Sequence, residues 1–384
     1  MRWTPDMTSF AFLRFTTLIF IVLIPVLAFG IEPKNDRIVS PTDSSQYDYW
    51  LSKLTIEEKI GQLLMIRLPW KTKEINPKTL EMMKNIPVGG VALFRDNMET
   101  TKQIQTLTKN LQALARLPLF IAIDEEGGRV SRVGKFFDKP TPPAFNIGEQ
   151  GDTAIASATA RTIAQRLAKL GINMNFAPIA DIWSNPANTV IGNRAFGKKP
   201  DIVGDMVEAT VRGFASEGVL SVTKHFPGHG DTKEDSHNQL AIYPHGRERF
   251  DQMEALPFIK ASKAHTDGIM VGHIITPAFK ESDSLPVTFS AFWLQNILRE
   301  EIGFDGLIIT DGLDMRALTD NFTDAQIVLG TFLAGADIML LPVNPSIAYQ
   351  ALLDGYRSGL FDEHRLNQSV RRILRAKEKW LVRQ

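Results

Sequence analysis

The segment KHFPGHGDTKEDSH, residues 224–237, concentrates three histidines and three acidic side chains in one short stretch. Gly228 and Gly230 permit backbone angles that helices and strands do not use, so we expect this segment to form a loop. Histidine and carboxylate side chains on a loop can bind a metal ion, flank a phosphate or transfer a proton. The loop is therefore compatible with three kinds of site, and the spacing of these residues helps to distinguish between them.

A metal site is the first of these alternatives. The loop offers nitrogen and oxygen ligands at four positions: His225, His229, Asp231 and His237. Their spacing argues against a metal, because a proline and two glycines separate them, whereas metal sites usually present ligands from a rigid element. A phosphate site needs a run of backbone N–H groups at a helix start, and GHGDT is weak evidence for one. Serine nucleophile chemistry lacks a GxSxG turn.

The composition is that of a globular protein with no strongly charged partner. The chain has 384 residues, of which 44% are hydrophobic and 22% charged, so it can bury a large core. Lys and Arg total 43, as do Asp and Glu, which leaves no basic excess for binding nucleic acid. The chain has no cysteine, which excludes disulfides, thiolate metal ligands and a thiol mechanism.

Eight short apolar runs alternate with stretches of helical periodicity. The runs cover residues 60–66, 89–94, 117–123, 172–180, 218–226, 268–274, 306–310 and 336–342. Short and nearly continuous apolar runs are typical of parallel strands that are buried on both faces. Eight strand and helix alternations predict a (β/α)8 barrel of the TIM type as a single catalytic domain. A doubly wound sheet is the rival fold, but no GxGxxG follows the first run.

The N-terminus differs from the rest of the chain. Residues 15–30, FTTLIFIVLIPVLAFG, are uncharged and follow Arg14, a pattern that predicts a secretory signal peptide, with an uncleaved anchor as the alternative. We therefore expect a periplasmic or secreted protein with no stable membrane partner beyond such an anchor. The predicted organisation is a signal peptide or anchor over 1–30, a linker over 31–49 and the barrel domain over 50–384.

Ionisable residues stand where five consecutive apolar runs end. They are Asp124, Asp181, Lys224 with His225, His273 and Asp311. In a (β/α)8 barrel the carboxyl ends of the strands form one rim, and the chemistry takes place there. A single loop charge is more often just solvated, but five at the same end favour a functional site.

Sugar hydrolysis fits this rim. A retaining glycosidase needs a carboxylate nucleophile and a second group that first donates a proton and then removes one. Asp311 follows an apolar run, which would mount a nucleophile rigidly. A histidine can carry the proton because its pKa lies near neutrality. Asp235 precedes His237 by two residues, so in an extended segment the carboxylate can orient the imidazole.

Four motifs together carry a family resemblance. DEEGGRVSR, GNRAFG, KHFPGHGDTKEDSH and FDGLIITDGLDM, in this order, resemble the barrel domain of glycoside hydrolase family 3 and its single-domain β-N-acetylhexosaminidase branch. In β-glucosidases of that family a second domain usually supplies the acid/base, whereas this branch carries an Asp-His pair on a barrel loop. One departure is TDGLDM, where the family often reads SDDL-x-M, so that Gly312 replaces the second acid.

The resemblance implies roles for eight residues. Asp311 would be the nucleophile that forms a covalent glycosyl-enzyme, and His237 the acid/base with Asp235 as its partner. The residues that match the family's binding site for the non-reducing sugar are Asp124, Arg132, Arg194, Lys224 and His225.

The resemblance also implies a substrate class. The expected enzyme is an exo-acting β-N-acetylglucosaminidase that removes non-reducing terminal GlcNAc from peptidoglycan fragments, such as muropeptides, or from chitooligosaccharides. It would use no metal and no organic cofactor, and we expect a monomer. Two alternatives remain open, which are a β-glucosidase-like specificity and a cell-wall sugar-binding barrel without turnover.

Overall fold

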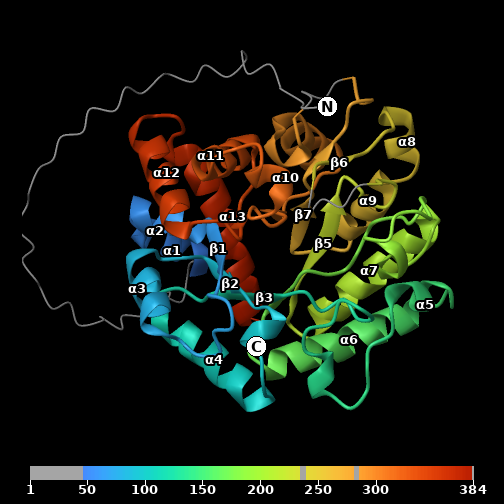
Figure 1. The fold of residues 1–384 in the computed structure, drawn as a ribbon, viewed down its shortest axis with the longest axis horizontal. Coiled ribbons are helices and arrows are strands. Elements are labelled where there is room, and N and C mark those ends of the chain that lie inside the picture. Colours follow the sequence, from blue (N-terminus) through green and yellow to red (C-terminus); the bar gives the residue numbers. More distant parts are fainter. Residues whose placement is uncertain (1–45, 234–238, 281–284, 383–384) are drawn as a thin grey trace, which may run out of the picture. The chain divides into compact units, whose positions relative to one another are not determined.

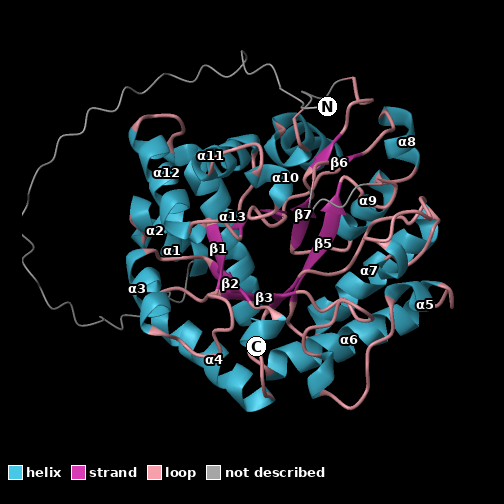
Figure 2. Ribbon diagram, viewed as in Figure 1, coloured by secondary structure: helices cyan, strands magenta, loops and turns pink. Residues whose placement is uncertain are grey.

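The computed structural model describes residues 46–233, 239–280 and 285–382. Eight parallel strands form one sheet in the order β10-β1-β2-β3-β4-β5-β7-β9. A parallel bridge between Ile309 and Ile338 joins the two ends of this sheet, so the sheet closes into a barrel. Figures 1 and 2 show the strands in the centre with helices around them. The predicted (β/α)8 barrel is confirmed, and each predicted apolar run overlaps one of the eight barrel strands.

The strands of the barrel are short. Their bounds are β1 (Leu64–Arg67), β2 (Gly90–Ala92), β3 (Phe120–Ile123), β4 (Met174–Asn175), β5 (Leu220–Phe226), β7 (Gly268–Val271), β9 (Leu307–Thr310) and β10 (Met339–Leu340). The fourth run gives only two residues of regular strand, and Ile179 then pairs with Lys224 through an isolated bridge.

Helices cover the outside of the barrel. The α-helices are α1 (Gln46–Lys53), α2 (Ile56–Gln62), α3 (Pro77–Asn85), α4 (Thr101–Leu114), α5 (Ala144–Gly148), α6 (Thr153–Lys169), α7 (Pro200–Ser216), α8 (Arg247–Gln252), α9 (Ala255–Lys263), α10 (Arg316–Thr319), α11 (Asp324–Ala334), α12 (Pro345–Arg357) and α13 (Glu363–Val382). A π-helix spans Phe292–Glu301, and short 3-10 turns span Arg95–Asn97, Gly134–Phe136, Gly192–Arg194 and Val287–Phe289.

Local sequence signals explain where several helices begin and end. Thr55 and Glu58 form a capping box at the start of α2, in which each side chain accepts the other residue's backbone N–H. Pro200 begins α7, where a missing N–H costs nothing. Gly171 and Gly218 follow α6 and α7 with φ of 72° and 74°, a left-handed conformation that glycine adopts readily at a helix end.

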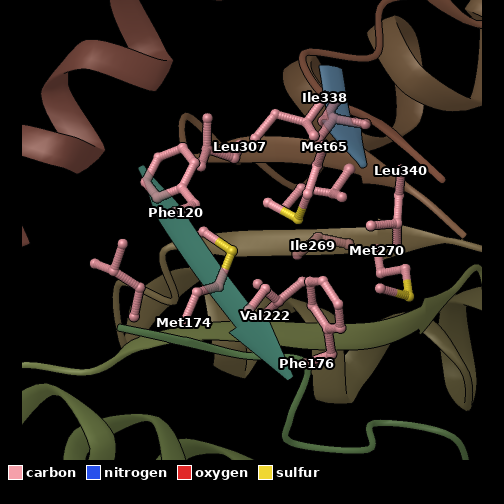
Figure 3. Packing of buried hydrophobic residues seen from close by; sticks show 14 of the residues in the cluster. Met65, Phe120, Met174, Phe176, Val222, Ile269, Met270, Leu307, Ile338 and Leu340 are labelled. Atoms are coloured by element: carbon pink, nitrogen blue, oxygen red, sulfur yellow. The ribbon is translucent and has the colours of Figure 1, made fainter. Parts of the chain in front are cut away.

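Apolar side chains fill the barrel between the strands. Figure 3 shows Met65, Met174, Val222, Ile269 and Leu307 directed toward one another from five different strands. Each of these side chains is buried, so the barrel is a packed core and not a pore. The polar rim therefore rests on a rigid base.

Helix α13 places a lysine at the opposite end of the barrel from the rim. Lys377 is buried, and its Nζ donates to Gln62 Oε1 at 2.6 Å and lies 5.0 Å from the centre of the Phe120 ring. Gln62 precedes β1 and Phe120 begins β3, which locates this lysine near the amino ends of the strands. Burial lowers the pKa of Lys377 to about 7.

A second, two-stranded sheet lies beyond the barrel strands. β6 (Ala241–Ile242) pairs in parallel with β8 (Ile274–Ile275), and the hydroxyl of Tyr243 donates to Glu254 Oε2 at 2.7 Å. Two-residue strands carry no periodic signal, which is why the sequence did not predict this sheet.

The predicted signal segment and Asp235 and His237 lie outside the described residues. Within the described part of the chain, no helix combines the length and the apolar character needed to cross a membrane.

Candidate active site

Parallel pairing brings the predicted rim residues to one end of the barrel. Asp124 and Asp311 directly follow β3 and β9, Lys224 and His225 lie in the last part of β5, and Asp181 and His273 lie in the segments after β4 and β7. Because all these strands run in the same direction, their carboxyl ends meet at one rim. The side chains that were singled out from five separate segments are thus neighbours.

A network of buried charges forms around Lys224. Its Nζ contacts Asp124 Oδ1 at 2.6 Å and Glu126 Oε1 at 2.8 Å. Arg194 donates from Nε and Nη2 to the two carboxylate oxygens of Glu126, each at 2.8 Å. Arg132 Nη2 lies 3.7 Å from Asp124 Oδ2, at the more exposed side of the network. The structure therefore brings together four of the five predicted sugar-binding residues.

Glu126 was not singled out from the sequence, yet it holds two of those residues. Its side chain is only 4% exposed, and it accepts from both Lys224 and Arg194. Buried cations need counter-ions, and DEEGGRVSR offers three carboxylates beside the strand end. The need for a counter-ion could have pointed to this motif, but it does not show which carboxylate pairs with which cation.

The network stays charged at neutral pH. Burial opposes the ionisation of Glu126, but the charges of Lys224 and Arg194 and their hydrogen bonds outweigh it and hold the pKa of Glu126 well below the usual carboxyl range. Burial likewise opposes the charge on Lys224, and the Asp124 and Glu126 carboxylates more than compensate, so the pKa of Lys224 is raised. The result is a fixed array of donors and acceptors at the rim.

Asp181 orients His225. Its carboxylate is fully buried and lies 2.7 Å from His225 Nδ1 through Oδ2, while Oδ1 accepts the backbone N–H of His229 at 2.6 Å. Burial opposes the charge of Asp181, but His225 is chief among the partners that keep the pKa of this carboxyl lowered. An ionised carboxylate only accepts, so Nδ1 of His225 carries the proton and Nε2 is the other polar atom of the ring.

The turn at His229 packs tightly against the segment after β4. His229 is buried, with Nδ1 2.6 Å from Thr232 Oγ1, and Asn188 Nδ2 donates to its carbonyl at 2.7 Å. A Cβ at Gly230 would lie 1.8 Å from the carbonyl oxygen of Ile182, so only glycine fits there. Burial and then the neighbouring His225 lower the pKa of His229, against the opposing charges of Asp181 and Asp311. His229 therefore shapes the turn as a neutral imidazole.

The turn after β9 holds Asp311 from both sides. Its backbone N–H donates to Val271 O at 2.9 Å, and its Oδ1 accepts the N–H of Gly312 at 2.8 Å. The carbonyl of Gly312 in turn lies 2.9 Å from Nε2 of the fully buried His273, whose Nδ1 contacts Thr288 Oγ1 at 2.8 Å. A carboxylate mounted in this way has little freedom to rotate.

At Gly312, where the sequence differs from the family pattern, the Asp314 carboxylate lies close to the place of a side chain. A Cβ at position 312 would lie 2.9 Å from Asp314 Oδ1, so a side chain there would have to displace this carboxylate. Asp314 Oδ2 also lies 3.3 Å from Arg67 Nη1, at the end of β1. Burial, and to a lesser extent the charge of Asp311, raises the pKa of Asp314, while Arg67 opposes that rise.

Among the residues that the structure describes, no three His, Asp or Glu side chains are grouped so that they could hold a metal ion. The acidic and imidazole groups near the rim are instead engaged with cations, backbone N–H groups or hydroxyls. The prediction of a metal-free site thus remains to be tested in solution.

The chain is similar to known proteins over most of its length. The chain matches the Glycosyl hydrolase family 3 N terminal domain over residues 55–376. The chain belongs to glycosyl hydrolase family 3. Among curated family relatives, it is 36% identical over 368 residues to Beta-hexosaminidase A of Pseudoalteromonas piscicida, covering 85% of this chain and 61% of that protein. It is 37% identical over 268 residues to Beta-hexosaminidase of Chromobacterium violaceum, covering 68% and 73% of the two chains.

Solved structures give the same family. A glycoside hydrolase family 3 beta-N-acetylglucosaminidase from Paenibacillus sp. str. FPU-7 superposes with a TM-score of 0.82 at 38% identity, covering 86% of this chain and 63% of that one. LpqI of M tuberculosis superposes with a TM-score of 0.77 at 30% identity, covering 85% and 94%. This family 3 chain thus spans less than two thirds of the Pseudoalteromonas and Paenibacillus proteins and nearly all of LpqI.

Proposed function

We propose that this family 3 barrel is an exo-acting, retaining β-N-acetylglucosaminidase. One observation carries the proposal: the charged network of Asp124, Lys224, Glu126 and Arg194 shares one barrel rim with Asp311, a carboxylate fixed by the turn after β9. A sugar presents several hydroxyls, and this network offers both ionised acceptors and cationic donors for them. The names of the relatives above support GlcNAc as the sugar.

In the proposed first step, Asp311 attacks the anomeric carbon of the terminal GlcNAc. The bond from that carbon to the leaving-group oxygen breaks, its electron pair goes to that oxygen, and His237 protonates it as general acid. The product is a glycosyl ester of Asp311. A water molecule then attacks the same carbon, His237 takes its proton, and the Asp311 carboxylate leaves. Two inversions at one carbon retain the β configuration.

Asp235 would orient His237 in this mechanism, as an aspartate orients the histidine of a catalytic triad. His225, Lys224, Asp124, Arg132 and Arg194 would bind the sugar held at the non-reducing end. Nε2 of His225 is the ring atom available for that contact, because Asp181 holds Nδ1. These side chains bind and orient the sugar, and the bond changes take place at Asp311 and His237.

The natural substrates that we propose are peptidoglycan fragments, such as muropeptides, and chitooligosaccharides. We further propose that the protein acts as a monomer in the periplasm or after secretion. The predicted N-terminal signal segment supports that location. No nucleic acid partner is expected, because basic and acidic side chains balance at 43 each.

The test compares an aryl β-GlcNAc substrate with the corresponding aryl β-glucoside. Turnover of the first is expected to exceed that of the second, to disappear in Asp311→Ala, and to be unaffected by EDTA. Asp320→Ala is a matched control, because Asp320 pairs with the exposed Arg316 in the same segment. His237→Ala should lose least activity on the most activated leaving groups, which need little protonation. Preference for the glucoside would establish the β-glucosidase-like alternative, and binding without turnover would establish the sugar-binding one.

A further inference from the structure

Trp70 is the most exposed large apolar side chain among the described residues. Its relative exposure is 72%, and the next value, for Leu360, is 52%. Trp70 follows β1, so it lies on the loop at the carboxyl end of that strand, which is the rim that also carries Asp311. An indole at this position can offer a broad apolar surface to a bound molecule.

The loop that carries Trp70 is held in one conformation. The N–H of Thr72 donates to Pro69 O at 3.0 Å, which closes a turn around Trp70 and Lys71. Lys71 has a φ of 59°, a left-handed conformation that is unfavourable for a residue with a side chain. Its N–H donates to Asp96 Oδ2 at 2.9 Å, which holds this conformation. Strain retained in this way is typical of ligand-binding segments.

Arg67 connects this loop to the segment of the proposed nucleophile. Its Nη1 lies 3.3 Å from Asp314 Oδ2, and Asp314 is three residues beyond Asp311. Trp70 is three residues beyond Arg67, and three residues span at most about 11 Å. The Cα of Trp70 therefore lies within about 11 Å of the Cα of Arg67, the residue whose side chain contacts the Asp311 segment.

Charged residues follow Trp70 in the sequence. Lys71, Lys73 and Glu74 are exposed, so charged side chains flank the indole on this side of the loop. A protein or membrane partner would need a larger continuous apolar area. A pyranose ring suits such a site better, because one face carries only C–H groups while its edge carries hydroxyls.

We propose that Trp70 is the platform for a sugar on the leaving-group side of the scissile bond, with Arg67 beside it as a hydrogen-bond donor. This inference rests on the proposed glycosidase activity and extends it, because it makes a β-linked oligosaccharide of GlcNAc the preferred substrate. The terminal sugar is held by charged groups, and the second sugar is held by stacking. A shallow, exposed platform also allows that sugar to leave after each turnover.

The experiment measures KM for chitotriose and the inhibition constant of free GlcNAc, which has no leaving-group sugar, in Trp70→Ala and Trp70→Phe. Trp70→Ala should raise KM about tenfold, the loss expected for one aromatic stacking contact, with the GlcNAc constant unchanged within about twofold. Trp70→Phe should recover most of the affinity. Leu360→Ala, an exposed apolar residue between α12 and α13, should change neither value.

An unchanged KM in Trp70→Ala, or an equal rise in both constants, would overturn the platform. The proposal would also be overturned if sedimentation showed that the wild-type protein forms dimers and that Trp70→Ala does not, because Trp70 would then act in self-association. If the wild-type protein turns over neither chitotriose nor an aryl β-GlcNAc, the glycosidase proposal fails by itself. In that case a fluorescence titration with chitotriose still tests whether Trp70 binds a sugar. The fluorescence of the wild-type protein should change on binding, and Trp70→Phe should remove this change. If the wild-type fluorescence does not change, the proposal is overturned.

Discussion

Replacing Glu126 by glutamine tests whether one buried carboxylate holds the sugar-binding cations in place. In the wild-type protein, Lys224 and Arg194 both donate to Glu126 at 2.8 Å, and its side chain is only 4% exposed. Glutamine keeps the size but removes the charge, and its NH2 group, which replaces one carboxylate oxygen, would face a donor of a cation. Lys224 keeps Asp124 as a partner, whereas Arg194 keeps a hydrogen bond to the carbonyl of Val190.

The expected loss of stability follows from this geometry. Removing one partner of a buried ion pair costs about 3–5 kcal/mol, because an uncompensated charge is left in the interior. The pKa of Glu126 is lowered in the folded state, so its stabilising contribution is fully present above the unfolded-state value near 4.3 and declines as the pH falls below it. The difference between wild type and Glu126→Gln should therefore be constant from pH 5 to pH 8 and shrink in stronger acid.

The assay is urea unfolding at several pH values together with steady-state kinetics on aryl β-GlcNAc. Displaced cations should lower kcat/KM on the order of a hundredfold. Glu208→Gln is the matched control: Glu208 pairs with Arg212 at the same 2.8 Å, but Arg212 is 62% exposed, so the change should stay below about 1 kcal/mol. If Glu126→Gln unfolds within about 1 kcal/mol of the wild type and keeps its kcat/KM, the argument from the buried network is wrong.

Two further substitutions probe other buried groups. Lys377→Met should raise the free energy of unfolding at pH 7 by about 3 kcal/mol, after the hydrogen bond lost by Gln62 is subtracted. Because the folded-state pKa of about 7 lies below that of a free lysine, the unfolded wild-type chain binds more protons above pH 7, so wild-type stability should rise toward pH 10 and the variant should lack this rise. Urea midpoints at both pH values decide this, and a destabilised variant at pH 7 would contradict it. Asp181→Asn should raise KM for aryl β-GlcNAc about 10–100-fold, because His225 loses a charge-assisted hydrogen bond. An unchanged KM would show that His225 needs no such orientation.

Much of the fold could be predicted because its signal is local. Runs such as LPLFIAI and GLIIT are short and apolar, as strands buried on both faces must be, and each gave a strand of the barrel. One of the stretches of helical periodicity between the runs, Phe292–Glu301, forms with π-helical geometry, which apolar periodicity alone does not distinguish from an α-helix. The paired strands β6 and β8 were missed because two residues have no period.

The contacts that organise the site could not be predicted in the same way. Arg194 contacts Glu126 across 68 positions, Lys224 contacts Asp124 across 100, and Lys377 contacts Gln62 across 315. DEEGGRVSR offers three carboxylates to several cations, and the sequence contains no information on which of them meet. Only packing decides that Asp124 and Glu126 share Lys224 and that Glu125 instead accepts the N–H groups of Arg132 and Val133.

The sequence by itself determined the barrel and the side chains that stand on its rim. Eight apolar runs encode eight strands, and the parallel direction of those strands forces Asp124, Lys224, His225 and Asp311 to the same end. The tertiary structure alone decided how these groups are held: Glu126 and Asp181 become anchors because burial makes an unpaired charge too costly. The tertiary structure also decided that Trp70 is exposed, because Asp96, on the loop after β2, accepts a hydrogen bond from the turn that carries Trp70.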